Sequence, residues 1–460
     1  MHILKHLRWP AVLLLPVLVY FAAPQDISPK APLFMAMTSM AVLAWAFNVF
    51  PAIGVAALLT FAYMLGGVAP SEVVFGPWTT VLPWLTFAAV IIGEAMDKSG
   101  LGRRLALRCL GVAGASFYGL LFGFFIGGIL LALVLPSILA RLVIFCAIAT
   151  GIIDTLRLDP KSRMSSAIIL MAFMGAAAPQ FLFLHTSESF IWAFSMLFKD
   201  GTAPNFWEYC IHGSFFSICY TIVSMLVCCV VKGKEKLEQS GEGLAYIRQS
   251  LAELGPLTGK EIKLLCLVLG MVLGFMLQPW TGIDPVYIFC VLALCSYLPG
   301  IDILERESMG HLEVMFLIFV AGCMAIGFVG NATGFNAWAV QQVLPLMQDW
   351  SQTMSIVMAY LSGIFVNFML TPFAATAAFT PALGELGQAM HVNPLPIFYA
   401  FQYGVDQYVL PYEAVYFLYI FITNRVSLVH IAGALVIRAV LCGFMLAAIA
   451  IPYWKLVGIM

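Results

Sequence analysis

Long apolar stretches, each close to the length of a membrane-crossing helix, dominate the hydrophobic pattern of this chain. A helix needs about 20 predominantly apolar residues to cross a bilayer core, and this pattern predicts an all-α polytopic membrane protein with about 11–12 transmembrane segments. A transmembrane β-barrel would instead show short segments in which apolar and polar residues alternate. The clearest candidate segments are residues 11–23, 33–50, 53–68, 116–135, 138–154, 164–183, 210–231, 263–279, 285–298, 353–370, 373–390 and 431–452.

Two further apolar stretches, 82–98 and 312–331, are short or interrupted, and a glycine-containing turn follows each of them. In transporters, segments of this kind often form re-entrant hairpins, whose backbone groups line a cavity instead of contacting lipid. We therefore expect a hairpin at each position. A tilted or partly interfacial helix is the alternative interpretation.

A polar stretch between residues 232 and 263 divides the chain near its middle and carries six Lys or Arg and five Glu residues. Such a stretch is most simply a cytoplasmic linker, and a short surface helix at 244–254 is expected within it. The predicted organisation is N-terminal scaffold helices at 1–70, a first repeat at 71–231, a linker at 232–262, further scaffold helices at 263–310, and a second repeat at 311–460.

The N-terminus carries Lys5 and Arg8 ahead of its first apolar stretch. A secretory signal peptide is one interpretation, but no clear small-residue cleavage site follows. We expect a retained first helix with its basic end in the cytoplasm, and residence in a bacterial inner membrane.

A weak internal repeat relates the two halves. Gly100 precedes Ser137 by 37 residues, and Gly334 precedes Thr371 by the same number. Ser137 and Thr371 both lie where a proline and small residues interrupt an apolar stretch. The spacing therefore predicts two repeats, which we expect to be inverted relative to each other.

The interruptions predict broken helices near 136–141 and 371–376. Lipid cannot satisfy the backbone groups that a broken helix exposes, so such breaks persist where they line a cavity or bind a ligand. The positive N-terminal end of a half-helix suits an anion.

Composition narrows the function. Only 10% of the 460 residues are charged and 62% are apolar, which excludes an ordinary soluble domain. The net charge of −1 and the lack of a basic stripe give no sign of nucleic-acid binding. The cysteines lie mostly in apolar stretches without ligand spacing, so no metal site and no cofactor is expected.

The sequence LPSILAR at 135–141 resembles a segment of the divalent anion/sodium symporter family, which includes a citrate/succinate exchanger branch. That family carries a Ser-Asn-Thr motif in each half, and the second copy would fall on Thr371-Pro372-Phe373. The segments at 94–107 and 392–400 also resemble the family. The resemblance implies transport by alternating access, with a moving unit in an elevator-type mechanism, and a homodimer.

The chain departs from these motifs, which the family links to sodium and to a substrate carboxylate. Ile138 and Leu139 stand where the first motif has Asn and Thr, and Pro372 and Phe373 stand in the second. Their side chains lack the oxygen ligands that a hard cation needs, although backbone carbonyls could still serve. Proton coupling or anion exchange is therefore favoured, with sodium-coupled anion symport as the alternative.

Polar residues inside apolar stretches are candidates for binding a small anion. Arg141 could grip a carboxylate, sulfonate or sulfate, or it could form a structural ion pair. His185 lies in the polar sequence HTSES, which could contribute to a site or form an extramembrane loop. The candidate substrate-binding residues are Ser137, Arg141, His185, Thr186, Ser187, Thr371, Thr376 and Gln407.

Three carboxylates are candidates for the coupling of transport to protons. Asp406 and Glu413 lie in a nearly uncharged aromatic stretch, and Glu188 is the matching residue of the first half. Buried carboxylates can bind protons near neutral pH. A purely structural pairing with Arg425 or Arg141 is the alternative.

These features predict a secondary active transporter for a small anion, such as a di- or tricarboxylate, a sulfonate or a sulfate-like ion, with the lipid bilayer as its surroundings. No nucleophile–base pair, phosphate loop or zinc signature indicates an enzyme. The rival classes are an intramembrane enzyme that uses His185 with Glu188 or Asp406, and a channel.

Overall fold

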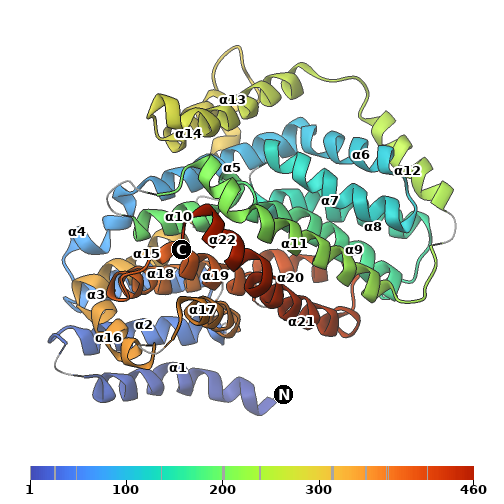
Figure 1. Cartoon of the computed structure of the whole chain (residues 1–460). Coiled ribbons are helices and arrows are strands. Elements are labelled where there is room, and N and C mark those ends of the chain that lie inside the picture. The colour runs from blue at the N-terminus through green and yellow to red at the C-terminus, as the bar shows by residue number, and fades with distance from the viewer. Residues whose placement is uncertain are drawn as a thin grey trace.

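The computed structural model describes residues 2–460 apart from 25–26, 48, 136, 199–202, 238–239, 312–314, 348–349, 369, 371 and 412. Every regular element in this described part is helical (Figure 1). Up to the central linker the α-helices are α1 (His2–Ala22), α2 (Ala31–Ala46), α3 (Ala52–Leu65), α4 (Ser71–Val74), α5 (Val81–Ser99), α6 (Leu101–Ala113), α7 (Phe117–Val134), α8 (Ile138–Thr155), α9 (Arg163–Ala177), α10 (Glu188–Leu197) and α11 (Phe206–Lys232).

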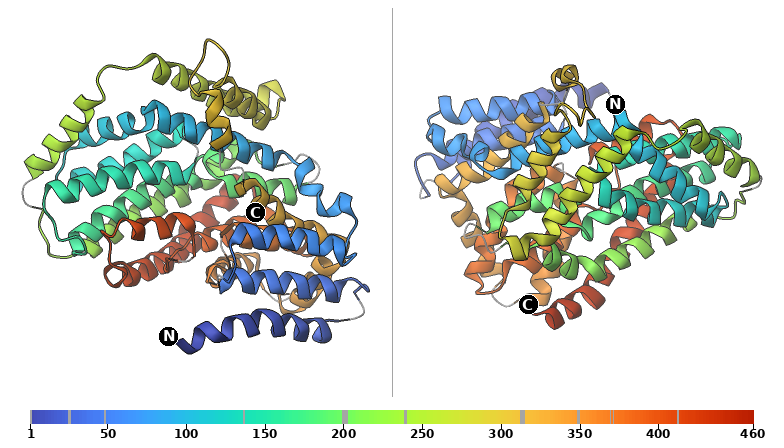
Figure 2. Two further views of the ribbon diagram at one scale, coloured as in Figure 1. Left: turned by 180° about the vertical axis from the view of Figure 1, so that it is seen from behind. Right: turned by 90° about the horizontal axis from the view of Figure 1, so that it is seen from above.

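The remaining α-helices are α12 (Ser240–Glu253), α13 (Gly259–Thr281), α14 (Pro285–Cys295), α15 (Met315–Ala332), α16 (Phe335–Met347), α17 (Gln352–Asn367), α18 (Pro372–Ala389), α19 (Pro394–Val405), α20 (Val415–Ile422), α21 (Leu428–Met445) and α22 (Ile451–Val457). Short helices are η1 (Gly76–Thr79), η2 (Ala178–Phe181), η3 (Leu184–Thr186), η4 (Arg306–His311) and η5 (Leu446–Ala450). Helices α1 to α3 lie along one edge of the molecule and α13 with α14 along the opposite edge (Figure 2).

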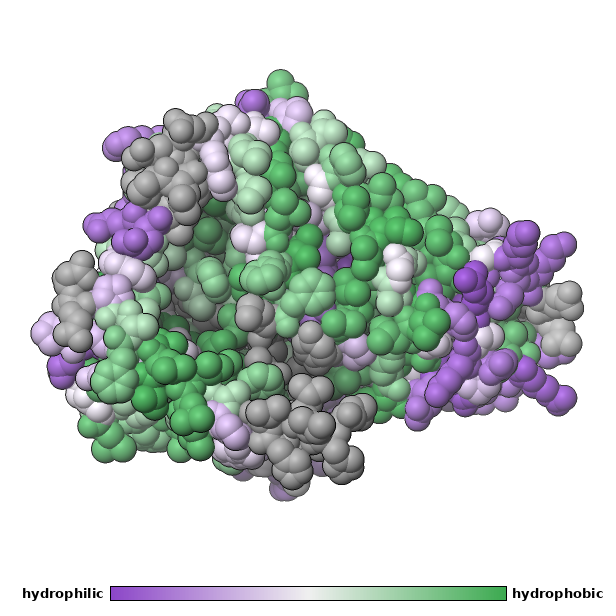
Figure 3. Space-filling view, turned by 90° about the horizontal axis from the view of Figure 1, so that it is seen from below, coloured by the Kyte–Doolittle hydropathy of each residue, from purple (hydrophilic) through white to green (hydrophobic). Residues whose placement is uncertain are grey.

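The predicted all-α membrane fold is confirmed. Within the described residues, six helices are long and apolar enough to cross a membrane, and five shorter helices are also apolar. Seen from below, apolar residues cover the middle of the surface and hydrophilic residues gather towards two ends (Figure 3). This distribution suits a protein whose central belt contacts lipid.

The two predicted re-entrant hairpins differ from the observed structure. Residues 82–98 lie within the continuous helix α5, and the described part of 312–331 lies within the continuous helix α15. Gly100, with φ of +76°, ends α5 in the left-handed conformation and connects it to α6. The glycine therefore caps a helix instead of marking the exit of a hairpin.

Helices are interrupted at four places inside the chain. The connection at 135–137 separates α7 from α8, and 368–371 separates α17 from α18. The segment 178–187 lies between α9 and α10, and 406–414 lies between α19 and α20. The same order of elements thus occurs in both halves, while an inverted relation between the halves stays a prediction.

Glycines let the backbones of neighbouring helices approach closely at these places. A Cβ atom on Gly128 of α7 would lie 1.9 Å from the Gly175 carbonyl oxygen of α9. A Cβ atom on Gly404 of α19 would lie 2.0 Å from the Tyr360 carbonyl oxygen of α17. Small residues commonly form such contacts between membrane helices. In the first half α7 therefore packs tightly on α9, and in the second half α17 packs tightly on α19. An interruption follows α9 and another follows α19.

The central linker forms the helix α12 at Ser240–Glu253, close to the expected helix at 244–254. It packs against α6 and α8, with Ile247 buried. Arg104 of α6 fastens the end of this segment, since it forms a buried salt bridge of 2.6 Å with Glu261 and also donates to three backbone carbonyls at 254–256. The linker is therefore anchored to the helical body at both its middle and its end.

Candidate functional site

Arg141 is fully buried in the first turn of α8. Its Nε donates a hydrogen bond of 3.0 Å to the Ala176 carbonyl, near the end of α9, and its Nη1 donates to the Leu135 carbonyl, which follows α7. The last carbonyls of a helix have no partner within that helix. Arg141 therefore satisfies carbonyls at two helix ends and fixes the 135–137 connection against α9.

His185 is buried within the interruption between α9 and α10. Its Nε2 lies 3.0 Å from the Ala132 carbonyl oxygen, and since a carbonyl only accepts, Nε2 is the donor. Its Nδ1 is buried and has no hydrogen-bond partner among the described residues. The rings of Phe183, Phe206 and Phe275 surround the imidazole. One polar atom of His185 thus stays available to a ligand or a water molecule.

Thr186 and Ser187, the two residues that follow His185, are also buried within the protein. The Thr186 hydroxyl donates 2.8 Å to the Phe183 carbonyl, so it stabilises the local turn of η3. Ser187 is buried at the start of α10. The half-buried Ser137 caps α8, since its hydroxyl accepts a hydrogen bond from the Ala140 amide. Two helix N-termini of the first half therefore begin at predicted site residues.

Glu413 anchors the second interruption. Its two carboxylate oxygens accept from the Val409 amide at 2.8 Å, the Leu410 amide at 3.0 Å and the Asn367 side-chain nitrogen at 3.1 Å. Arg425, one of the partners expected for the acids, pairs instead with Asp154 at 2.7 Å. Glu413 therefore ties the 406–414 segment to the end of α17 through hydrogen bonds.

Asp406 follows the last residue of α19 and is buried. Its Oδ1 accepts a hydrogen bond from the Tyr408 hydroxyl, whereas its Oδ2 has no hydrogen-bond partner among the residues that the structure describes. The Gln402 side chain lies one helical turn earlier, and its Nε2 likewise has no hydrogen-bond partner among the described residues. Asp406 is therefore less completely hydrogen-bonded than Glu413.

Arg438, in the middle of α21, is a buried charge that the sequence analysis missed. Its Nη1 donates 3.1 Å to the Tyr220 hydroxyl and lies 2.9 Å from the Met174 sulfur, and its Nη2 lies 3.5 Å from the Tyr408 carbonyl oxygen. A signal was present in the sequence, because an arginine inside an apolar stretch is itself a sign of function.

Other predicted residues have local or indirect roles. The Thr376 hydroxyl of α18 donates 2.8 Å to Gln402 Oε1 of α19. Gln407 Nε2 donates 3.1 Å to the Tyr403 carbonyl one turn earlier. Thr371 lies outside the described residues, and so does the side chain of Glu188, whose backbone begins α10.

The structure arranges the candidates in two clusters. In the first, Arg141 and His185 both bind carbonyls at the end of α7, those of Leu135 and Ala132. In the second, Arg438 approaches the carbonyl of Tyr408, whose hydroxyl donates to Asp406. Aromatic contacts connect the elements that carry them. The Phe181 and Tyr403 rings are 5.2 Å apart, and the Phe173 and Tyr408 rings are 6.2 Å apart. The two interrupted helices therefore lie beside each other in the interior.

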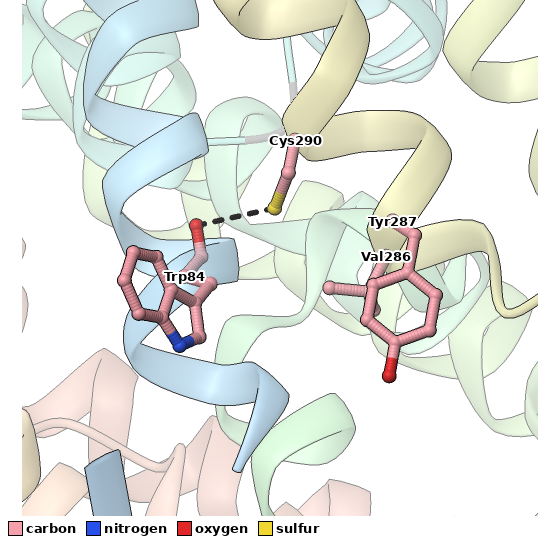
Figure 4. A pocket seen from close by; sticks show the side chains of 4 residues that line it. All are labelled: Trp84, Val286, Tyr287 and Cys290. Atoms are coloured by element: carbon pink, nitrogen blue, oxygen red, sulfur yellow. Dashed lines mark hydrogen bonds between the residues drawn. The ribbon is translucent and has the colours of Figure 1, made fainter. Parts of the chain in front are cut away.

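Two cavities lie away from these clusters. The first, of about 300 Å³, lies between α5 and α14, where Cys290 Sγ is 3.4 Å from the Trp84 carbonyl oxygen (Figure 4). Val286 and Tyr287 complete its apolar lining, which offers no charge to an anion. The second, of about 590 Å³, lies along α6 and α7. Across the described residues, no group of three or more His, Cys, Asp or Glu side chains could hold a metal ion.

Apolar helices, interrupted in the interior beside buried charged side chains, are characteristic of membrane transporters. A family model described as the transmembrane region of sodium:sulfate symporters matches residues 4–460. The chain belongs to this family, the divalent anion/sodium symporters, and the resemblance found in the sequence is confirmed. It is a transporter and not an enzyme.

Curated relatives agree with this membership. The chain is 25% identical over 334 residues to an L-tartrate/succinate antiporter of Escherichia coli strain K12, a match that covers 68% of this chain and 66% of the relative. It is 24% identical over 311 residues to a membrane protein of Cupriavidus necator, covering 65% of this chain and 58% of the relative. An uncharacterized transporter of Haemophilus influenzae is 22% identical over 325 residues, covering 68% and 66%. The chain thus matches less than two thirds of the length of these relatives.

Proposed function

We propose that this anion transporter moves a small dicarboxylate across the membrane by alternating access, through anion exchange or proton coupling. The observation that carries the proposal is the pair of interrupted helices, whose breaks hold buried His185 and Asp406 inside the membrane region. Breaks of this kind expose backbone groups and half-helix ends where a substrate can bind.

The dicarboxylate class is supported by the relatives that carry the name L-tartrate/succinate antiporter. Sulfate and sulfonate share the negative charge and are the competing substrates. The proposed substrate contacts are Ser137, at the N-terminus of α8, Ser187, at the N-terminus of α10, and the open Nδ1 of His185. Arg141 positions these elements, because at least two of its donors already bind backbone carbonyls.

The remaining assignments rest on the sequence, and the elevator-type movement and the homodimer rest on the family resemblance. Thr186, Thr371, Thr376 and Gln407 are proposed to border the substrate, with Glu188, Asp406 and Glu413 as coupling candidates. An elevator-type movement, a homodimer, an inner-membrane location and a cytoplasmic N-terminus are proposed with them.

Sodium-independent transport is favoured by the side chains at the first motif. Ile138 and Leu139 have no oxygen atoms with which to bind a hard cation. Sodium-coupled symport would need backbone carbonyls alone for that task. The proposal therefore expects sodium to have no effect on substrate binding.

Thermal unfolding of the purified protein tests the substrate class and the role of sodium together. Succinate, tartrate, citrate, sulfate and methanesulfonate would each be added in sodium salts and in potassium salts of equal ionic strength. A ligand present at 100 times its Kd stabilises the folded state by about 2.7 kcal/mol. We expect succinate or tartrate to raise Tm equally in both salts. A rise with sulfate alone, or a rise that needs sodium, contradicts the proposal.

A further inference from the structure

Three ionisable side chains meet around the second interruption. Asp406, Glu413 and Arg438 are each at most 2% exposed, and Arg438 Nη2 reaches the segment that carries both acids, 3.5 Å from the Tyr408 carbonyl oxygen. Arginine keeps its charge in proteins. With both acids ionised, the group therefore carries one net negative charge. One bound proton would make this group neutral. Because a net charge in a low-dielectric interior is costly, the group is expected to bind that proton.

Hydrogen bonding indicates which acid holds that proton. Glu413 accepts from three N–H donors, and such bonds stabilise the ionised form of a carboxylate. Asp406 accepts from the Tyr408 hydroxyl through Oδ1, while Oδ2 has no hydrogen-bond partner in the described part of the chain. The open Oδ2 of Asp406 is therefore the better place for a proton.

Arg438 is placed to balance the ionised form of Asp406. Its guanidinium is held by Tyr220, by the Met174 sulfur and by the Tyr408 carbonyl, so two of its three partners belong to α9 and α11. In the described residues it makes no salt bridge within 4 Å. Because its position is fixed by these neighbours, its charge stays in place when the proton on Asp406 comes or goes.

A connection leads from Asp406 to α18, the helix that follows the 368–371 connection. Gln402 lies one helical turn before Asp406, and its backbone carbonyl accepts a hydrogen bond of 3.1 Å from the Asp406 amide. Gln402 Oε1 accepts from Thr376 of α18, whereas Gln402 Nε2, like Asp406 Oδ2, has no hydrogen-bond partner among the described residues. A proton on Oδ2 turns that oxygen from an acceptor into a donor, which changes the partner that it can take. The Gln402 amide would then reorient, and the Thr376 contact with it.

We propose that Asp406 binds and releases a proton during transport, with Arg438 as its fixed counter-charge and Gln402–Thr376 as the link to α18. The proposal rests on the transport function proposed above. In the step, an O–H bond forms at Oδ2 with a proton from water on one side of the membrane, and the same bond breaks towards water on the other side. The titratable or charged groups near Asp406 are Tyr408, Tyr209, Tyr220 and Arg438.

The test is uptake of labelled succinate by the full-length protein in proteoliposomes with an imposed inward proton gradient. In the wild type we expect the gradient to drive accumulation. In Asp406→Asn, which keeps the shape but cannot ionise, we expect gradient-driven accumulation to be lost while succinate–succinate counterflow continues. Glu94→Gln, at an acid outside the cluster that pairs with Lys98, is the matched control and should accumulate like the wild type.

Arg438 is tested by the pH profile of counterflow. Removing the positive charge favours protonated Asp406, so Arg438→Met should move the half-maximal pH upwards, and Arg438→Lys should lie closer to the wild type. The double variant Asp406→Asn/Arg438→Met removes both charges and should have a higher Tm than Arg438→Met alone. This comparison needs no transport activity and therefore also serves if a single variant folds poorly.

The outcomes separate the two proposals. Absence of succinate counterflow in the wild type contradicts the proposed function. Wild-type counterflow combined with an Asp406→Asn variant that still accumulates succinate under the proton gradient overturns the inference alone. An unshifted pH profile in Arg438→Met removes Arg438 from the proposed role.

Discussion

The Arg141 guanidinium binds backbone carbonyls at helix ends, the Glu413 carboxylate binds backbone amides within the 406–414 interruption, and both side chains are buried. Burying a charge costs several kcal/mol unless hydrogen bonds satisfy it. A broken helix supplies free carbonyls at one end and free amides at the other. At the scale of residues, the interruptions therefore create the charge-binding positions that these side chains occupy.

Arg141→Ala should destabilise the protein strongly, because it leaves the Leu135 and Ala176 carbonyls buried without this donor. Each unsatisfied buried group costs about 1–3 kcal/mol. We expect a clear fall in Tm for Arg141→Ala, measured by thermal unfolding in detergent. Arg103→Ala, at an exposed position of α6, is the control and should leave Tm nearly unchanged. Equal Tm values for both variants would show that Arg141 does not fix the 135–137 connection.

Sequence reasoning found Asp406 and His185 but missed Arg438. His185 lies in a visibly polar stretch and Asp406 has a second acid, Glu413, seven residues further on, whereas Arg438 is an isolated charge within an apolar span. Its partners Tyr220 and Met174 are 218 and 264 residues away in the chain. Only the packing of α21 against α9 and α11 makes them neighbours, and no local pattern in the sequence reports that packing.

The presence of the membrane helices could be predicted from the apolar stretches, because a helix surrounded by lipid needs a continuous apolar segment. The hairpin predictions at 82–98 and 312–331 show the limit of this reasoning at the scale of elements. A short apolar stretch followed by glycine is compatible with a re-entrant hairpin, in which the chain reverses direction, and with a continuous helix that the glycine caps. Gly100 adopts the left-handed conformation of a helix cap. The sequence alone does not distinguish such a cap from the turn of a hairpin.

The close glycine contacts of the two halves make a prediction about packing. Replacing a helical glycine by alanine at an open position is favourable by about 1 kcal/mol. At Gly128 the new Cβ would overlap the Gly175 carbonyl oxygen, so α7 and α9 must separate. We expect Gly128→Ala to lower Tm.

Gly93→Ala in α5 is the matched control, since no atom lies within 4 Å of its Cβ position. This variant should keep or slightly raise Tm. If both glycine variants have the same Tm, the tight α7–α9 contact is wrong.

At the scale of the whole molecule, the linker is fastened to the helical body by one buried ion pair. Arg104 and Glu261 join α6 to α13. Removing one partner of a buried pair typically costs about 3–5 kcal/mol. Arg104→Met should therefore loosen the 254–256 segment and increase its cleavage by protease. Cleavage equal to that of the wild type would show that the pair does not hold the linker.

The central claim is that this transporter exchanges dicarboxylates without sodium. The direct measurement is counterflow of labelled succinate into proteoliposomes preloaded with unlabelled succinate, with potassium in place of sodium on both sides. We predict saturable accumulation of unmodified succinate that is equally fast when sodium is restored. Counterflow that appears only with sodium and is unaffected by pH would contradict the account.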